Sequence, residues 1–247
     1  FSQRFKRDGC KEGGAGIGTW LSLEAPDELA REPAQVGLWT TRGVRLFAIG
    51  GTTDNGLASS ATPTGPGAIT GLTAAGRDVV KRILEAGALV DVSNASELSI
   101  DEVTQMAEKA GVPVVAGHSN ARALADAAWN LSDPQIRGIA KTGGVVGVTA
   151  RHGMLATGRN ATMRHLVEQI RHMVRVAGPD HVAIGSSFED GVGPVADFKS
   201  AADYPRLARA LSDAGLSQDV IERVFYKNAL RVLCPTEAPR AKRALER

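Results

Sequence analysis

From residue 43 onward the sequence repeats one pattern: a short apolar run rich in β-branched residues, a turn, and an amphipathic stretch of helix-forming residues. The apolar runs are nearly continuous instead of alternating with polar residues, which is typical of strands that are buried on both faces. Strands that alternate with helices of about 10–15 residues predict right-handed βαβ units and a parallel sheet. The sequence therefore predicts an α/β fold.

The boundaries of the predicted elements come from turn and capping residues. Strands are expected at 44–49, 88–92, 112–116, 145–149 and 181–185. Helices are expected at 73–86, 99–111, 134–142, 163–177, 204–214 and 218–233, with helical turns between 119 and 128. Ser99 and Glu102 have the spacing of a capping box, which predicts that the second helix begins there.

A closed barrel and an open doubly wound sheet both satisfy this pattern. The nucleotide-binding signatures of open sheets, GxGxxG after the first strand and GxxxxGK[ST], are missing from the sequence. The length of 247 residues suits one barrel. We therefore expect a TIM-type (β/α)8 barrel, incomplete or rearranged at its N-terminal side. It forms a single domain over residues 1–247, with a divergent part at 1–42, a core at 43–233 and a tail at 234–247.

Composition excludes several classes of partner. The net charge is only +2, aromatic residues make up 4%, and no basic block is flanked by aromatic residues, so we expect no nucleic-acid partner. The apolar runs are far shorter than a membrane span, and no signal-like segment is visible. The two cysteines, Cys10 and Cys234, do not form a disulfide framework pattern, so a reducing cytoplasm is the predicted location.

Polar and titratable residues follow the predicted strands, where α/β barrels carry their chemistry. In chain order these strand ends are Gly50-Gly51, Asp91-Val-Ser-Asn94, Gly117-His118-Ser119-Asn120, Arg151-His152, and Ser186-Ser187-Phe188-Glu189-Asp190. The arrangement predicts a functional site at the carboxyl ends of the strands.

Over about residues 43–233, the strand ends and flanking segments resemble the renal (membrane) dipeptidase family, peptidase family M19. The segments that carry this resemblance are Gly43-Val-Arg-Leu-Phe, Asn55-Gly-Leu-Ala, Leu89-Val-Asp-Val-Ser, His118-Ser-Asn-Ala-Arg, Asn130-Leu-Ser-Asp, Gly143-Gly-Val-Val-Gly-Val, His181-Val-Ala-Ile-Gly-Ser and Asn228-Ala-Leu-Arg-Val. The resemblance implies a (β/α)8 barrel and a binuclear zinc enzyme that cleaves dipeptides.

It also implies a set of site residues, of which two match. Glu24 corresponds to the bridging glutamate and His118 to the second of the later histidine ligands, so both are candidate catalytic residues and the candidate ligands of any bound metal. The other implied ligands are missing or replaced. The resemblance implies a His-x-Asp pair near the N-terminus, but no histidine of this chain is followed by x-Asp. Where the family has histidine, histidine, aspartate and a carboxylate-binding arginine, this chain has Gly51, Asn94, Ser187 and Trp129, which we expect to bind substrate.

One imidazole and one carboxylate are too few donors for two zinc ions, because each catalytic zinc takes about three protein ligands. The predicted cofactor is therefore none, with zinc as the alternative that the family resemblance implies. His152 and Asp190 are candidate acid–base partners for metal-free chemistry with His118. Structural roles are the alternatives: a hydrogen bond for His118, a solvated carboxylate for Glu24, and an acceptor for loop amides at Asp91.

Three functions remain open from the sequence, and with them whether the chain is an enzyme. The first is a divergent dipeptide or amide metallohydrolase with a degraded zinc site and little classical dipeptidase activity. The second is a metal-independent enzyme that acts on a small amide or amino-acid-derived molecule in a biosynthetic pathway. The third is a non-catalytic relative, a pseudoenzyme that binds a ligand or partner. The expected ligand is a small or dipeptide-like molecule, and a homodimer is the expected assembly.

Overall fold

The structure is a computed structural model that describes residues 20–63, 71–156, 161–186, 188, 195 and 197–234. The chain divides into two compact units. The first comprises Phe1–Pro113 and Leu230–Arg247, and the second comprises Val114–Ala229. The single barrel domain over the whole chain stays a prediction.

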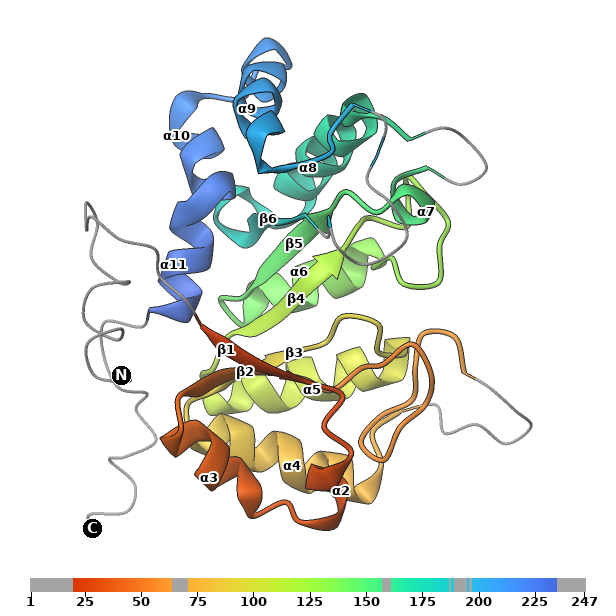
Figure 1. Ribbon diagram of the computed structural model, residues 1–247, viewed down its shortest axis with the longest axis vertical. Helices are drawn as coiled ribbons and strands as arrows, with labels where there is room; N and C mark the ends of the chain where they lie inside the picture. Colours follow the sequence, from red (N-terminus) through yellow and green to blue (C-terminus); the bar gives the residue numbers. More distant parts are fainter. Residues whose placement is uncertain are drawn as a thin grey trace. The chain divides into compact units, whose positions relative to one another are not determined.

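The first unit carries three parallel strands. They are β1 (Leu21–Glu24), β2 (Val44–Ala48) and β3 (Leu89–Asp91), and β2 pairs with both of its neighbours. Its helices are α2 (Glu28–Arg31), α3 (Gln35–Thr41), α4 (Ala74–Glu85) and α5 (Glu97–Ala110). Along the chain α4 follows β2 and α5 follows β3 (Figure 1). Phe47 and Ile49 at the end of β2 and Val79 and Ile83 of α4 are fully buried and form its core.

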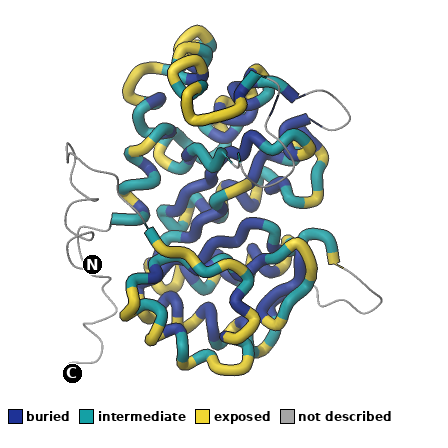
Figure 2. The backbone as a smooth tube through the Cα atoms, in the orientation of Figure 1, coloured by how far each residue is buried: buried dark blue, intermediate teal, exposed yellow. Residues whose placement is uncertain are grey.

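The second unit repeats the arrangement with three further parallel strands. They are β4 (Val114–Ser119), β5 (Val145–Thr149) and β6 (Val182–Ser186), with β5 in the middle. The helices are α6 (Asp133–Lys141), α7 (His152–Leu155), α8 (Met163–Ala177), α9 (Tyr204–Asp213) and α10 (Gln218–Glu222), and a π-helical turn at Arg223–Lys227 leads into α11 (Asn228–Leu233). β5 is buried along its whole length, and Figure 2 shows helices with both buried and exposed faces.

The predicted α/β class is confirmed, since the described residues form six parallel strands that alternate with helices. Local capping explains several boundaries. The Thr73 hydroxyl accepts from the N–H of Gly76 at the start of α4, and Ser132 and Gln135 form a capping box at the start of α6. Gly111 ends α5 in the left-handed conformation, with φ 66°.

Three local predictions are wrong. The helix expected from Ser99 begins at Glu97, because Ser96 provides the cap and Glu102 points elsewhere. Residues 121–128 form turns instead of helix, since both backbone groups of Ala121 bond the side chain of Gln169. The helix expected over 218–233 is interrupted by the π-helical turn, which precedes a buried Asn228 that donates to the carbonyls of Pro179 and Val182.

No helix in the described part of the chain is long and apolar enough to cross a membrane. Cys234 is disulfide-bonded, against the expectation of reduced cysteines. The chain's other cysteine, Cys10, lies outside the described residues. Because disulfides are typical of oxidising compartments, the predicted cytoplasmic location gains no support from this residue.

Three glycines allow an unusually close approach of strands in the second unit. A Cβ added at Gly147 of β5 would lie 2.3 Å from the carbonyl oxygen of Gly117 in β4. A Cβ added at Gly185 of β6 would lie 2.2 Å from the same oxygen. The backbones of β4, β5 and β6 therefore leave no room for a side chain at these positions.

Replacement of Gly147 by alanine should destabilise the protein. The added methyl group meets backbone atoms that cannot rotate away, so we expect a loss of about 1–3 kcal/mol in the free energy of unfolding, measured by urea denaturation. Gly153 is the control, because a Cβ at this exposed position of α7 meets nothing within 4 Å. Gly153→Ala should be neutral or stabilising by about 0.5–1 kcal/mol. Equal effects of the two substitutions would contradict the close approach.

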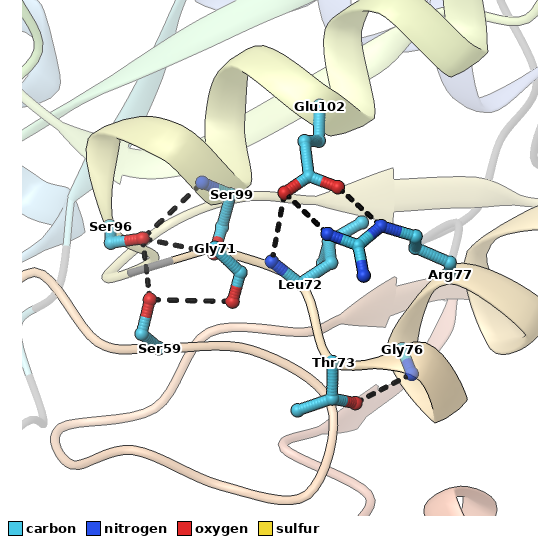
Figure 3. Close-up of polar contacts among 9 residues, drawn as sticks. All are labelled: Ser59, Gly71, Leu72, Thr73, Gly76, Arg77, Ser96, Ser99 and Glu102. Atoms are coloured by element: carbon cyan, nitrogen blue, oxygen red, sulfur yellow. Dashed lines mark hydrogen bonds and ion pairs between the residues drawn. The ribbon is translucent and has the colours of Figure 1, made fainter. Parts of the chain in front are cut away.

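In the first unit, an ion pair between Arg77 and Glu102 joins α4 and α5. Figure 3 shows Glu102 of α5 facing Arg77 of α4 and the N–H of Leu72. The Arg77 Nε donates to Glu102 Oε2 at 2.7 Å, Nη2 donates to Oε1 at 3.0 Å, and the Leu72 N–H donates to Oε1 at 3.3 Å. Beside it, the Ser96 hydroxyl joins Ser59 and the start of α5. The bidentate ion pair thus also fixes the loop that enters α4.

Glu102→Ala should lower the free energy of unfolding by about 1–2 kcal/mol, after discounting the pair for its partial exposure. The matched control is Asp78→Ala, which removes the exposed ion pair to Arg82 within α4. A pair of that kind contributes only about 0.3–0.5 kcal/mol. Thermal and urea denaturation measure both variants, and a loss at Glu102 no larger than that at Asp78 would refute the assigned role.

Candidate functional site

Strained backbone marks the carboxyl ends of the strands. Among the described residues, three that are not glycine have left-handed backbone: Ala25 (φ 40°), Asn94 (φ 64°) and Ser186 (φ 59°). Ala25 directly follows β1, Asn94 lies in the loop after β3, and Ser186 is the last residue of β6. Such conformations cost energy and gather at functional sites, so they support the strand ends as the place to search.

In the first unit, the structure brings three predicted site residues to one edge. Glu24 is the exposed last residue of β1 and pairs in register with Ala48 of β2. Gly51 follows β2, and a Cβ there would lie 3.7 Å from that of Ala25. Asn94 belongs to the loop after β3, which touches the end of β2, since a Cβ at Gly50 would lie only 2.3 Å from the oxygen of Ser93.

Carboxylate acceptors hold the loops at this edge. Asp91 is 4% exposed, and its Oδ1 accepts from the N–H of Ser93 at 2.7 Å. The predicted role of Asp91 as an acceptor for loop amides is therefore confirmed. Asp54, which the sequence did not single out, accepts from the N–H of Ser60 at 2.7 Å in the loop after β2. Both carboxylates serve the backbone.

In the second unit, His118 is an exposed side chain near the end of β4. The next residue, Ser119, is buried, and its hydroxyl donates to the carbonyl of Trp129 at 2.9 Å. The structure thus brings the backbone of Trp129 to the end of β4. The guanidinium carbon of Arg151, just after β5, lies 5.7 Å from the centre of the Trp129 ring, within cation–π distance.

The sequence placed Arg151 at a strand end but did not single it out as a candidate site residue. The structure brings its positive charge to the ring of Trp129, the residue that the resemblance aligned with the family's carboxylate-binding arginine. The indole N–H of Trp129 is buried and has no hydrogen-bond partner within the described part of the chain. A buried donor without a partner costs free energy, and a ligand oxygen is one way to satisfy it.

His152 has a structural contact. It begins α7, and its Nε2 accepts from the N–H of Ala161 at 3.2 Å. One nitrogen of the His152 ring is thus engaged by the backbone, and the acid–base role of His152 stays a prediction.

The loop after β6 is only partly described. Ser187 and Asp190 lie outside the described residues, so their predicted roles stay predictions. Ser186 is fixed from two sides: its carbonyl accepts from the N–H of Ala150 at 2.8 Å, and its hydroxyl shares a short hydrogen bond with the Tyr204 hydroxyl. Tyr204, which sequence reasoning missed, stacks edge-on with Phe198 at 5.6 Å.

The donors present do not fit the binuclear zinc centre that the resemblance implies. Among the described residues, no group of three or more histidine, cysteine, aspartate or glutamate side chains is arranged to hold a metal ion. The reason lies in the residue types, since Gly51 offers no side-chain donor and Asn94 offers only a neutral amide, a poor ligand for zinc.

Comparison with known proteins decides the family. The family model described as membrane dipeptidase (peptidase family M19) matches residues 9–247. The chain belongs to this family. A protein of Klebsiella pneumoniae described as an uncharacterized protein in the pqqA 5' region is 38% identical over 183 residues, which cover 72% of this chain and 65% of that protein. Dipeptidase tcpJ of Claviceps purpurea is 25% identical over 88% of this chain and 50% of its own length.

Solved structures of this M19 protein's relatives share its fold. The probable dipeptidase PvdM of Pseudomonas aeruginosa superimposes with a TM-score of 0.80 at 25% identity, over 90% of this chain and 70% of that one. A metallopeptidase of Rhodobacter sphaeroides, bound to a phosphinate mimic of the dipeptide L-Ala-D-Ala, gives a TM-score of 0.73 at 25% identity over 83% of this chain and 59% of that one. The chain spans only part of the length of its relatives. For the mouse dipeptidase 3, the matched segment is 35% of that protein.

Asn120 positions the end of β4 and offers a test of this geometry. It is fully buried, its Nδ2 donates to the carbonyl of Thr149 at 3.1 Å, and its Oδ1 accepts from the N–H of Thr149 at 3.2 Å. The side-chain amide therefore replaces a pair of backbone hydrogen bonds between the ends of β4 and β5, directly beyond His118.

Asn120→Asp should destabilise the protein by about 3 kcal/mol near pH 8, because an ionised carboxylate would face the Thr149 carbonyl. Burial beside that carbonyl raises the folded-state pKa of the new carboxyl above its unfolded value. The deficit should therefore shrink as the pH falls and the group regains a proton to donate. Urea denaturation at several pH values measures this, with the half-buried Asn94→Asp as control. A deficit that does not depend on pH would contradict the assignment.

Proposed function

We propose that this M19 protein binds a dipeptide-like or small amide ligand at its strand ends and has little or no classical zinc-dependent dipeptidase activity. The observation that carries the proposal is the shortage of metal donors among the described residues. The ligand class is supported by the relative from Rhodobacter sphaeroides, which was solved with a dipeptide mimic. Zinc deficiency is thus a property that we infer from residue types.

What the remaining groups can do follows from their chemistry. His118 is exposed near the end of β4, and its imidazole is a side chain that can take part in proton transfer. Trp129 brings an unpartnered N–H donor, and Arg151 brings a cation to the same strand ends. A carboxylate or carbonyl oxygen of a ligand is a suitable acceptor for both. Glu24, Gly51 and Asn94 stay candidate residues on the edge of the first unit.

A metal-independent enzyme is the second candidate, and His118 is the observation that favours it. An imidazole within reach of a bound amide can act as general base, with His152 or Asp190 as partner. A non-catalytic ligand-binding protein is the third. A homodimer completes the proposal. The cytoplasmic location stays a prediction, which the disulfide bond of Cys234 does not favour.

Metal content and turnover separate these candidates. Protein purified in the presence of zinc should hold much less than one equivalent by elemental analysis, and it should not hydrolyse L-Ala-D-Ala faster than buffer. The reason is that a neutral amide and a glycine cannot replace two imidazoles. The proposal is contradicted if each chain holds two zinc ions tightly and a chelator abolishes its turnover.

Two variants sharpen this experiment. Gly51→His combined with Asn94→His adds donors at the family's positions and should raise zinc content. The backbone must yield slightly, since the oxygen of Thr53 lies 3.1 Å from a Cβ at position 51. His118→Ala should leave the stability within about 0.5 kcal/mol, because the side chain is exposed. If the protein hydrolyses an amide in the presence of a chelator, and His118→Ala abolishes this turnover, the metal-independent enzyme is favoured.

A further inference from the structure

The second unit contains a surface pocket away from the strand ends discussed above. Its walls come from three segments: the loop after β4, the end of α7 and the first two turns of α8. Its volume is about 350 Å³, and it is lined by Leu124, Ala125, Asp126, Leu155, Ala156, Arg164, His165 and Glu168. A volume of that size falls within the range of small-molecule sites.

Buried amide side chains hold the walls in place. Asn130 is 1% exposed, and its Nδ2 donates to the carbonyls of Ala125 and Met154, both at 2.8 Å, which joins the loop to α7. Gln169 is fully buried and bonds both backbone groups of Ala121, which joins the same loop to α8. The pocket is therefore formed before any ligand arrives, and little conformational entropy is lost on binding.

The polar lining carries charges of both signs. Asp126 and Glu168 are anionic, and Arg164 is cationic and lies 3.5 Å from Glu168. His165 adds a second group: the Thr162 N–H donates to its Nδ1 at 3.2 Å, which leaves Nε2 as the ring nitrogen able to donate to a ligand. The pocket thus offers acceptors for an ammonium group together with donors for a carboxylate.

The rest of the lining is aliphatic. Leu124 is 44% exposed, an unusual position for a leucine in a loop, and Leu155 is buried at the end of α7. With Ala125 and Ala156 they provide an apolar wall beside the charged groups. A ligand that satisfies the whole lining needs an ammonium group, a carboxylate and a short aliphatic body.

We propose that this pocket binds a free α-amino acid with an aliphatic side chain as its zwitterion. The ammonium group lies toward Asp126 and Glu168, the carboxylate toward Arg164 and His165, and the side chain against Leu124 and Leu155. The site uses no residue of the strand ends. It is therefore independent of the proposed function and holds whether or not the chain hydrolyses a dipeptide.

The test is a titration of the full chain with L-leucine, L-leucinamide and N-acetyl-L-leucine, followed by NMR chemical shifts. L-Leucine should bind tightest, because leucinamide lacks the carboxylate and N-acetylleucine lacks the ammonium group. Asp126→Asn should weaken the binding of leucine and leucinamide by about fivefold and leave the affinity for N-acetylleucine unchanged. Arg164→Gln should weaken the binding of leucine and N-acetylleucine by a similar factor and leave the affinity for leucinamide unchanged.

Arg171→Gln is the matched control, since Arg171 is exposed on the same helix and does not line the pocket. It should leave all three affinities unchanged. The proposal is overturned if no saturable binding of leucine is seen up to about 10 mM, a weak affinity even for a small ligand. It is equally overturned if His118→Ala abolishes leucine binding while the pocket variants behave like Arg171→Gln, because leucine then binds at the strand ends.

Discussion

Three buried side-chain amides hold the loop after β4, and much of what is distinctive in the second unit depends on them. Asn120 completes the hydrogen bonding between the ends of β4 and β5, Gln169 takes both backbone groups of Ala121, and Asn130 ties the loop to α7. An amide both donates and accepts, so it can stand in for a backbone group where regular pairing stops. The same contacts place Trp129 beside β4 and shape the pocket against α8.

The family fold and the site chemistry diverge in this chain. Parallel strands bring their carboxyl ends to one edge, so any polar residues that follow them are positioned for chemistry whatever their identity. By the resemblance, those positions carry a glycine and an amide where the family has histidines, while His118 and Glu24 match the family's ligands. A fold shared with dipeptidases therefore does not by itself supply the donors that a zinc centre requires.

Sequence patterns located most of the regular elements because the signals were local. The helix over 163–177 and the strand over 145–149 were predicted with the boundaries that the structure gives, since periodicity and glycine stops define them. The helical turns expected after residue 119 were wrong because Gln169, almost fifty residues away in the chain, takes the hydrogen bonds of Ala121. Glu102 was assigned to a local cap for the same reason, whereas its partners are Arg77 and Leu72.

The sequence by itself determined the α/β class, the family and the identity of the donors, because each is carried by residue types and their spacing along the chain. Tertiary structure decided which of those residues meet. It placed Arg151 over Trp129, engaged His152 with Ala161, bound Ser186 to Tyr204 and enclosed the pocket beside α8. The physical reason is that a hydrogen bond or cation–π contact depends on distances of a few ångströms between side chains, and these distances exist only after distant segments have packed together.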